Sequence, residues 1–240
     1  MPHITCQAIV LRHADYREHD RMLTLFSPTL GRVEALCRGC KKIGSPLLAC
    51  SEFFAFGEYV LYTGKGRMTV TSCNLTESFY PLRSDWDKLK YATYMLSVCE
   101  AIVQPNEPNV HLFTLLARSL SRLCYQQKDA RAVTAAFLLH AAAISGYRPR
   151  LSHCVKCGRR LDEKEIRHFD SEDGGLVCPE CSEMMQRLLS VSPREVHWMQ
   201  EVLAIGIDKT ALPADHAPAA LLSAFVEERL EKPVRHKGLF

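Results

Sequence analysis

The sequence predicts an α+β protein in two parts: an N-terminal five-stranded OB-type β-barrel, and an all-α helical domain that carries an inserted four-cysteine module. Three observations lead to this prediction. Short apolar runs separated by turn residues fill the first part, a hydrophobic repeat of about 3.6 residues begins after Pro81, and two Cys-x-x-Cys pairs interrupt the helical region. We therefore expect domains at residues 1–80 and 81–240, with the cysteine module at about 151–182.

The composition is that of a globular protein with ordinary cores. Of its 240 residues, 47% are hydrophobic and 24% are charged. No apolar run approaches the roughly 20 residues of a membrane helix, and the start, Met1 to Cys6, is too short and polar for a signal peptide. We therefore expect a cytoplasmic protein with no membrane partner. The cysteine count of 11 is odd, and those outside the module lie mostly among apolar residues, which is typical of reduced, buried thiols.

The first part reads as strands separated by turns. The expected strands are Ile4–Arg12, Arg21–Phe26, Arg32–Arg38, Glu58–Thr63 and Arg67–Leu75. The segments at 27–31 and 64–66 contain the Gly and Pro residues expected of hairpin turns. Five short strands at this length favour an OB-type barrel, with an SH3-like barrel as the alternative.

The second part reads as helices with identifiable ends. The expected helices run from a Ser84 cap to about Val103, from Val110 to Tyr125, from Ala130 to Ser145, from Ser192-Pro193 to about Ile205, and from Pro218 to about Lys232. Pro and Asn residues at 104–108 separate the first two. The third is apolar nearly all round, which predicts a central, buried helix.

The four cysteines of the module have the spacing of a structural zinc site. Cys154, Cys157, Cys178 and Cys181 form two pairs separated by twenty residues. Four thiolates fill the tetrahedral shell of one zinc ion and leave no open position, so the ion is expected to stabilise a short polar segment and to take no part in a reaction. Iron bound by the same sulfurs, or two disulfides, are the alternatives. A third pair, Cys37 and Cys40, has no partner pair, and we assign it no role.

The charge distribution places any surface for a polyanion in the first 150 residues. Residues 1–150 carry 18 Lys and Arg against 12 Asp and Glu, whereas residues 151–240 carry 12 against 15. The loops after the first and third expected strands concentrate the cations that we predict to contact DNA: Arg12, Arg17, Arg21, Arg38, Lys41 and Lys42. Nearby rings, at Tyr16, Phe53, Phe54 and Phe56, are expected either to stack on bases or to belong to the barrel core. The alternative for the cations is a solvated rim. No Gly-rich phosphate loop or catalytic triad appears, so we predict no enzymatic activity.

Four stretches of the sequence resemble the bacterial RecO family of recombination mediators. They are Ala8–Arg12 with Glu18-x-Asp20-Arg21, Leu23–Phe26 and Gly31; Arg38-Gly39 with Lys41, Lys42 and Ser45; Phe137–Leu139 through Gly146-Tyr147-x-Pro149-x-Leu151 to Cys154 and Cys157; and the basic tail Arg235–Phe240. The resemblance extends almost from end to end.

The resemblance implies an OB barrel followed by a helical domain with the zinc module. It implies a protein that binds single-stranded DNA, contacts the C-terminal tail of single-stranded-DNA-binding protein and RecR, lets RecA load on covered DNA, and anneals complementary strands near the nucleoid. Two other classes remain open. A zinc-ribbon transcription or RNA-binding factor would share the barrel and the metal, and a metalloenzyme would need an open metal position.

Overall fold

The computed structural model describes residues 3–64, 66–126, 129–207, 214–230 and 233–234. The chain divides into two compact units, one made of residues 1–89 and 96–116 and the other of residues 90–95 and 117–240. Within the described ranges, no helix is long and apolar enough to cross a membrane. The basic tail at 235–240 lies outside the described residues.

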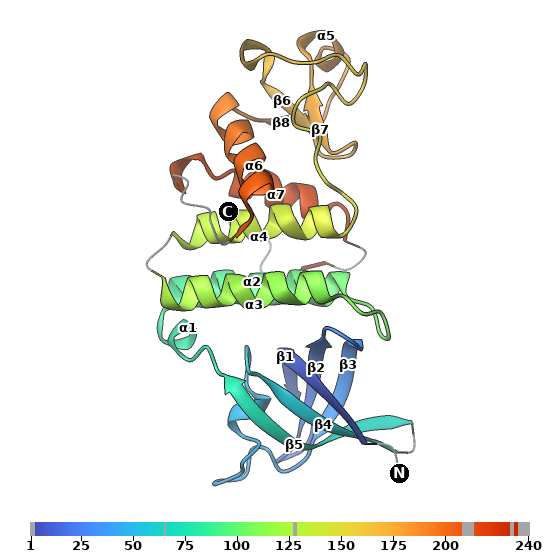
Figure 1. Ribbon diagram of the computed structural model, residues 1–240, viewed down its shortest axis with the longest axis vertical. Helices are drawn as coiled ribbons and strands as arrows, with labels where there is room; N and C mark the ends of the chain where they lie inside the picture. The colour runs from blue at the N-terminus through green and yellow to red at the C-terminus, as the bar shows by residue number, and fades with distance from the viewer. Residues whose placement is uncertain (1–2, 65, 127–128, 208–213, 231–232, 235–240) are drawn as a thin grey trace. The chain divides into compact units, whose positions relative to one another are not determined.

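The first unit contains a closed five-stranded barrel (Figure 1). Its strands are β1 (His3–Asp15), β2 (Arg21–Ser27), β3 (Gly31–Cys37), β4 (Phe56–Gly64) and β5 (Arg67–Glu77). They follow the order β1-β2-β3-β5-β4, and every neighbouring pair is antiparallel except β3 and β5, which run parallel and close the barrel. The predicted OB-type barrel is confirmed.

Alternate residues of each strand fill the barrel interior. Leu23, Leu25, Ala35 and Leu61 are fully buried, as expected for side chains that point to one face of a strand with a period of two. Tyr59 also lies inside, and its hydroxyl donates a hydrogen bond of 2.8 Å to the carbonyl oxygen of Cys50. That bond satisfies the phenol in an apolar interior.

The first helices follow the barrel, with one cap that differs from the prediction. The short helix α1 (Pro81–Ser84) ends where α2 (Trp86–Ile102) was expected to be capped. Asp85 is the cap instead, because its carboxylate accepts a 3.1 Å hydrogen bond from the backbone amide of Lys88. The prediction that Ser84 caps α2 was therefore wrong.

The segment between α2 and α3 (Val110–Tyr125) packs on the barrel within the first unit. The amide of Arg32 donates to the carbonyl oxygen of Gln104 at 3.1 Å, and the amide of Asn106 donates to that of Leu30 at 3.0 Å. The Phe113 ring at the start of α3 meets the ring of Phe26 edge-on, with centroids 5.4 Å apart.

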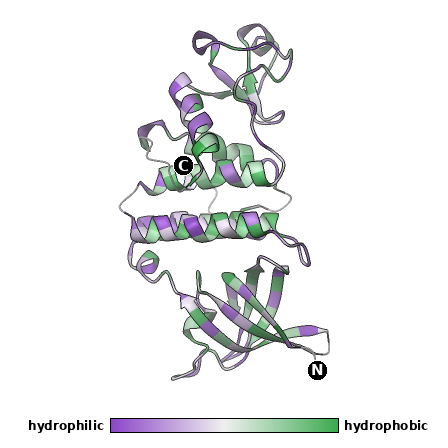
Figure 2. Ribbon diagram, viewed as in Figure 1, coloured by the Kyte–Doolittle hydropathy of each residue, from purple (hydrophilic) through white to green (hydrophobic). Residues whose placement is uncertain are grey.

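The second unit is built around α4 (Ala130–Ile144), which is buried along most of its length. Figure 2 shows the same helix as predominantly hydrophobic. Phe137, Leu138 and Leu139 have no exposed surface, and the helix packs against α6 (Pro193–Ile205) and α7 (Ala219–Glu227). The prediction of a central, buried helix is confirmed.

The ends of α6 and α7 have local causes. Ser192 and Glu195 form a capping box at the start of α6, as the Ser-Pro signal predicted. α7 ends at Glu227, earlier than the predicted end near Lys232, so that prediction was wrong. At this end, the Arg229 guanidinium donates a 2.9 Å hydrogen bond to the carbonyl oxygen of Phe225 and satisfies one of the last carbonyls of the helix.

A small three-stranded sheet organises the cysteine module. It has the order β7-β6-β8, from β6 (His168–Asp170), β7 (Gly175–Val177) and β8 (Leu189–Ser190), and the one-turn helix α5 (Pro179–Ser182) follows β7. The module has an apolar centre, because Phe169 and Leu176 are fully buried. Gly175 allows the chain at Arg150 to pair beside it, since a Cβ atom there would lie 2.6 Å from the Arg150 carbonyl oxygen.

Candidate metal centre and nucleic-acid interface

The four predicted cysteines converge on one point. Their Sγ atoms all lie within 4.8 Å of one another, and those of Cys157 and Cys178 are 3.8 Å apart. Sulfurs bound about 2.3 Å from a tetrahedral zinc ion lie about 3.8 Å from each other, so the set fits such an ion. Among the described residues, this is the only group of Cys, His, Asp and Glu side chains placed to hold a metal.

Each Cys-x-x-Cys pair lies in a tight turn that directs backbone amides at sulfur. The Cys181 amide donates to the Cys178 sulfur at 3.4 Å at the start of α5. In the other pair, Gly158 has a φ of +75° and donates from its amide to the Cys154 carbonyl oxygen at 3.0 Å. A side chain at Gly158 would be strained in this left-handed conformation.

The pKa values of the thiols differ when no cation is bound. Burial by itself would raise the pKa of Cys154, but hydrogen bonds from the amides of Cys157, Cys178 and Lys156 lower it to about 6. The hydrogen bond with Cys178, together with burial, raises the pKa of Cys181 to about 12. Four adjacent thiolates repel one another, so their common ionisation requires a bound cation.

Ion pairs join the two halves of the module around the cysteines. The guanidinium of Arg159 lies 2.5 Å from a carboxylate oxygen of Glu165 and 2.7 Å from one of Glu180. The Lys156 ammonium lies 2.9 Å from Asp170 and 2.8 Å from Asp173. Both cations lie within two residues of Cys157 in the sequence, so these pairs hold the first Cys-x-x-Cys turn against the rest of the module.

The basic loop after β3 is held by backbone hydrogen bonds to the loop between β1 and β2. The amide of Gly39, whose φ is +63°, donates to the carboxylate of Asp20 at 2.8 Å. The amide of Lys41 donates to the carbonyl oxygen of His19 at 3.1 Å. These bonds bring two basic segments that are about twenty residues apart to the same end of the barrel.

Three of the predicted DNA contacts line one open hollow at this end. Arg17, Arg38 and Lys42 surround a volume of about 470 Å³ together with Glu18, His19, Asp20 and Gly39. All three cations are exposed, and no ion pair joins any of them to another residue in the described ranges. Their charges are therefore available to an anion.

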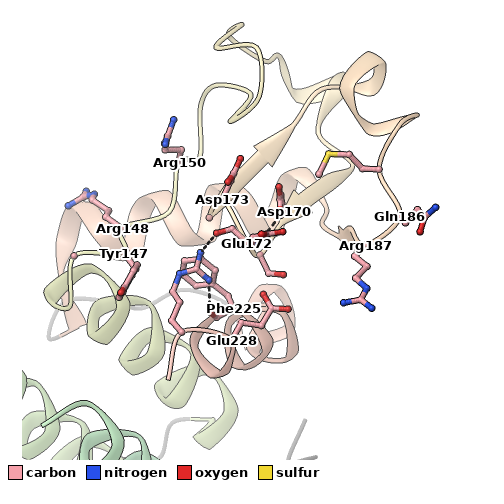
Figure 3. A pocket seen from close by; sticks show the side chains of 15 residues that line it. Tyr147, Arg148, Arg150, Asp170, Glu172, Asp173, Gln186, Arg187, Phe225 and Glu228 are labelled. Carbon is pink, nitrogen blue, oxygen red and sulfur yellow. Dashed lines mark hydrogen bonds between the residues drawn. The ribbon is translucent and has the colours of Figure 1, made fainter. Parts of the chain in front are cut away.

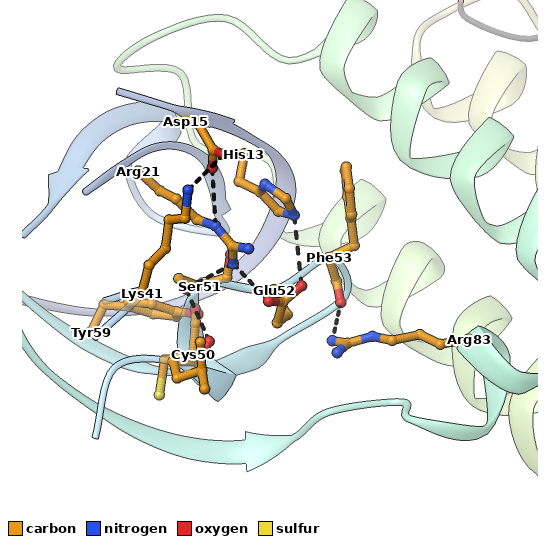
Figure 4. Close-up of polar contacts among 11 residues, drawn as sticks. His13, Asp15, Arg21, Lys41, Cys50, Ser51, Glu52, Phe53, Tyr59 and Arg83 are labelled. Atoms are coloured by element: carbon orange, nitrogen blue, oxygen red, sulfur yellow. Dashed lines mark hydrogen bonds and ion pairs between the residues drawn. The ribbon is translucent and has the colours of Figure 1, made fainter. Parts of the chain in front are cut away.

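The other three predicted contacts are paired with carboxylates. Arg12 lies 3.2 Å from Glu100, and Lys41 lies 2.7 Å from Asp15. The Arg21 side chain is only 13% exposed, and its guanidinium is 2.7 Å from Glu52 (Figure 4). Figure 4 shows Arg21 between the Asp15 carboxylate on one side and the segment at Ser51 and Glu52 on the other.

Arg67 belongs to the same basic end of the barrel, although the sequence interpretation did not include it. Its guanidinium donates to the Tyr16 hydroxyl at 3.3 Å and lies 5.6 Å from the ring centroid, while Arg17 lies over the same ring at 5.4 Å. The hydrogen bond from Arg67 lowers the pKa of Tyr16. A basic residue directly after the Gly64–Gly66 turn was the sequence signal for it.

The predicted aromatic residues divide between core and surface. Phe54 is fully buried, and Phe56 meets the Phe113 ring edge-on. Phe53 is half-buried against His13, with centroids 4.3 Å apart. Tyr16, which is 42% exposed, is the ring that remains available to a base.

A second hollow, of about 1080 Å³, lies in the other unit beside the cysteine module (Figure 3). Figure 3 shows Arg148 and Arg150 at one end and Arg187 at the other, with Phe225 between them. The Arg229 guanidinium covers the Phe225 ring at 3.9 Å. Within the described part of the chain, Arg148, Arg150 and Arg187 form no ion pair.

Two family models match the chain and together cover nearly all of it. "Recombination protein O N terminal" matches residues 1–79, and "Recombination protein O C terminal" matches residues 83–238. The chain belongs to the RecO family of DNA repair proteins.

Curated relatives agree with the family models. A protein named "DNA repair protein RecO" from Alkaliphilus metalliredigens is 34% identical over 178 residues, which cover 74% of this chain and 72% of the relative. Its namesake from Acetivibrio thermocellus is 30% identical over 192 residues, or 80% and 76% of the two chains. Another, from Desulforamulus reducens, is 28% identical over 233 residues, or 95% and 90%. The resemblance to the RecO family is thus confirmed.

Proposed function

We propose that this RecO-family protein is a recombination mediator whose barrel binds single-stranded DNA at the hollow lined by Arg17, Arg38 and Lys42. The observation that carries the proposal is the convergence on one open hollow of three exposed cations that form no ion pair among the described residues, on a loop held by backbone hydrogen bonds. Such a site attracts phosphates of any sequence, and the exposed Tyr16 ring beside it offers a face for a base.

The paired cations have secondary roles in this proposal. Lys41 and Arg12 reach phosphates only by sharing or leaving their carboxylate partners, so each adds less to affinity than an unpaired cation. Arg21 holds the Glu52 segment in place through its ion pair with that carboxylate. The barrel at 1–80 therefore serves as the DNA-binding domain, and we propose no catalytic role for any residue.

The four cysteines are proposed to hold one structural Zn²⁺. The ion would bind Cys154, Cys157, Cys178 and Cys181 and stabilise the module, because it would join two turns whose four sulfurs lie within 4.8 Å of one another. A closed shell of four thiolates supplies no open position for a substrate.

The helical domain at 81–240 is proposed to receive protein partners of the mediator. The hollow beside the module combines the exposed ring of Tyr147 with Arg148, Arg150 and Arg187, and this suits an acidic peptide that ends in an apolar residue. Such a peptide is the C-terminal tail of single-stranded-DNA-binding protein. The proposal also includes contact with RecR, RecA loading and strand annealing. It places the protein in the cytoplasm, near the nucleoid.

DNA binding is tested on the full chain with two unrelated oligonucleotides across a salt series. The Arg38→Ala/Lys42→Ala variant should weaken binding to both about equally and flatten the slope of log affinity against log salt by roughly 0.7 per lost contact. Arg131→Ala/Arg194→Ala is the matched control, because both side chains are exposed cations in the other unit. Equal affinity and slope for the two variants would refute the proposed interface. Losses of affinity that differ between the two oligonucleotides would favour the alternative, a zinc-ribbon transcription or RNA-binding factor.

The tail site is tested by fluorescence titration of a labelled acidic peptide that ends in Phe. Saturable binding at low salt should weaken severalfold in Arg148→Ala/Arg187→Ala and remain unchanged in Arg131→Ala/Arg194→Ala. Absence of saturable binding to the wild-type chain would contradict this part of the proposal and leave the DNA interface untouched.

A further inference from the structure

Ile43 stands at the tip of the basic loop with its whole side chain in solvent. Its relative exposure is 105%, the highest of the large hydrophobic residues described. It directly follows Lys41 and Lys42 and precedes Gly44. Folding buries none of this apolar surface, so the side chain is free to contact a ligand.

The loop that carries Ile43 is ordered by consecutive turns. The Lys42 amide donates to the Gly39 carbonyl oxygen at 3.2 Å, and the Ser45 amide donates to that of Lys42 at 3.0 Å. Gly44 has a φ of +78° with open space around it, so the backbone conformation sets this position. Ile43 is therefore presented on a short, turned backbone, and ordering it on a ligand costs little further entropy.

The surroundings of Ile43 favour a DNA strand as its partner. Arg38 and Lys42 line the hollow at one side of the loop and have no carboxylate partner in the described ranges, so the surface around the apolar tip attracts polyanions. A strand whose phosphates lie on these cations exposes its bases beside the backbone. Proteins that bind the minor groove of duplex DNA insert isoleucine and other apolar side chains between base steps, and the same contact is open to a single strand, whose bases are more accessible.

We propose that Ile43 is an apolar wedge that packs between neighbouring bases of a DNA single strand bound at Arg38 and Lys42. The inference rests on the proposed DNA interface and adds a contact with bases that is independent of charge. A wedge separates stacked bases without reading their identity, since every base offers an apolar face.

The test compares Ile43→Ser with Ile43→Leu in the full chain, using an oligonucleotide in which every second base is 2-aminopurine. Wild-type protein should raise the fluorescence, because the wedge unstacks neighbouring bases. Ile43→Ser should lose most of this rise and weaken binding about fivefold, less than the loss for a fully buried isoleucine. Ile43→Leu should retain both. The salt slope should be the same for all three, because no phosphate contact is removed.

Two controls separate failure of the wedge from failure of the interface. Met184→Ser removes an 88% exposed apolar side chain in the other unit and should change neither readout. If Arg38→Ala/Lys42→Ala binds like wild type, the interface itself is wrong. If that variant weakens while Ile43→Ser keeps the wild-type fluorescence and affinity, the wedge alone is overturned.

A lipid surface is the competing partner for an apolar tip between cations. Sedimentation with vesicles of phosphatidylcholine and phosphatidylglycerol measures it directly. One outcome would assign the tip to a membrane and overturn the wedge: wild-type protein binds the vesicles, Ile43→Ser does not, and the DNA readouts of the two proteins are the same. Equal, weak sedimentation of both proteins supports it.

Discussion

Gly31, the first residue of β3, lies directly against the carbonyl oxygen of Glu107. A Cβ atom at this position would be 2.6 Å from that oxygen and closer still to the carbonyl oxygen of Gln104. The contact is part of the antiparallel bridge between Gly31 and Pro105. The absence of a side chain at Gly31 thus allows the 104–108 segment to pack on the barrel.

Gly31→Ala should therefore destabilise the first unit far more than Gly44→Ala. Both glycines have a positive φ, +68° and +78°, so both variants carry backbone strain of about 1 kcal/mol. Only the first adds a clash with backbone atoms, and we expect a total loss of about 3 kcal/mol or more. Denaturant unfolding monitored by tryptophan fluorescence and circular dichroism measures the difference, and equal losses would contradict the contact.

Arg21→Ala should lower stability, whereas Arg38→Ala should not. The Arg21 guanidinium lies 2.7 Å from Glu52 and also donates to Ser51, so its removal leaves a half-buried carboxylate without its partner, at a cost of about 2 kcal/mol. Arg38 is exposed and unpaired within the described ranges, and its loss should stay within about 0.5 kcal/mol. Thermal unfolding of both variants checks this, and an unchanged melting temperature for Arg21→Ala would argue for a role in ligand contact alone.

Cys154→Ser or Cys178→Ser should lose the metal and loosen the second unit while leaving DNA affinity close to wild type. Three remaining thiolates bind zinc much more weakly than four, and the module depends on the sulfurs to join its two knuckles. Metal content of the purified protein and protease sensitivity of the module are the measurements. Cys73→Ser, a half-buried cysteine of β5, is the control that should retain the metal. A metal-free wild type with the same melting temperature would refute a structural ion.

Stability should fall with pH below about 6.5, and His140 should account for part of the loss. Burial lowers the pKa of His140 from 6.5, while its hydrogen bond with the Val202 backbone acts in the opposite direction. The folded state therefore favours the neutral ring, and the unfolded state takes up the proton first as the pH falls. His140→Gln should flatten the decline, and the exposed His197→Gln should not. Identical pH profiles for wild type and His140→Gln would contradict this assignment.

The sequence was sufficient for the features that local rules control. Alternation of residues such as Leu23 and Leu25 marked the strands, and the Ser192-Pro193 signal marked the start of α6. The four metal ligands followed from spacing alone. The small sheet of the module was missed because β8 has only two residues and pairs with β6 about twenty positions earlier, so no periodicity develops.

The difference between free and paired cations was beyond the sequence. Arg21 and Arg38 lie in similar basic segments, but Arg21 meets Glu52, which is 31 positions away and reaches it only in the closed barrel. Asp85 took the cap expected of Ser84 because α1 uses Ser84 as its last residue. Contacts that form only in the folded structure decide both cases, and a local sequence pattern does not predict them.

The parallel pairing of β3 with β5 also sets an order of assembly. Among themselves, β1 to β4 form only antiparallel pairs, so these four strands leave two unpaired edges, on β3 and β4, until residues 67–77 join them. While the chain is being synthesised, the barrel thus passes through a stage with a long exposed edge, the kind of surface that recruits other chains. A ribosome that stalls just after β4 would release an aggregation-prone fragment with open strand edges. One that stalls after Glu77 would release a chain whose barrel can close.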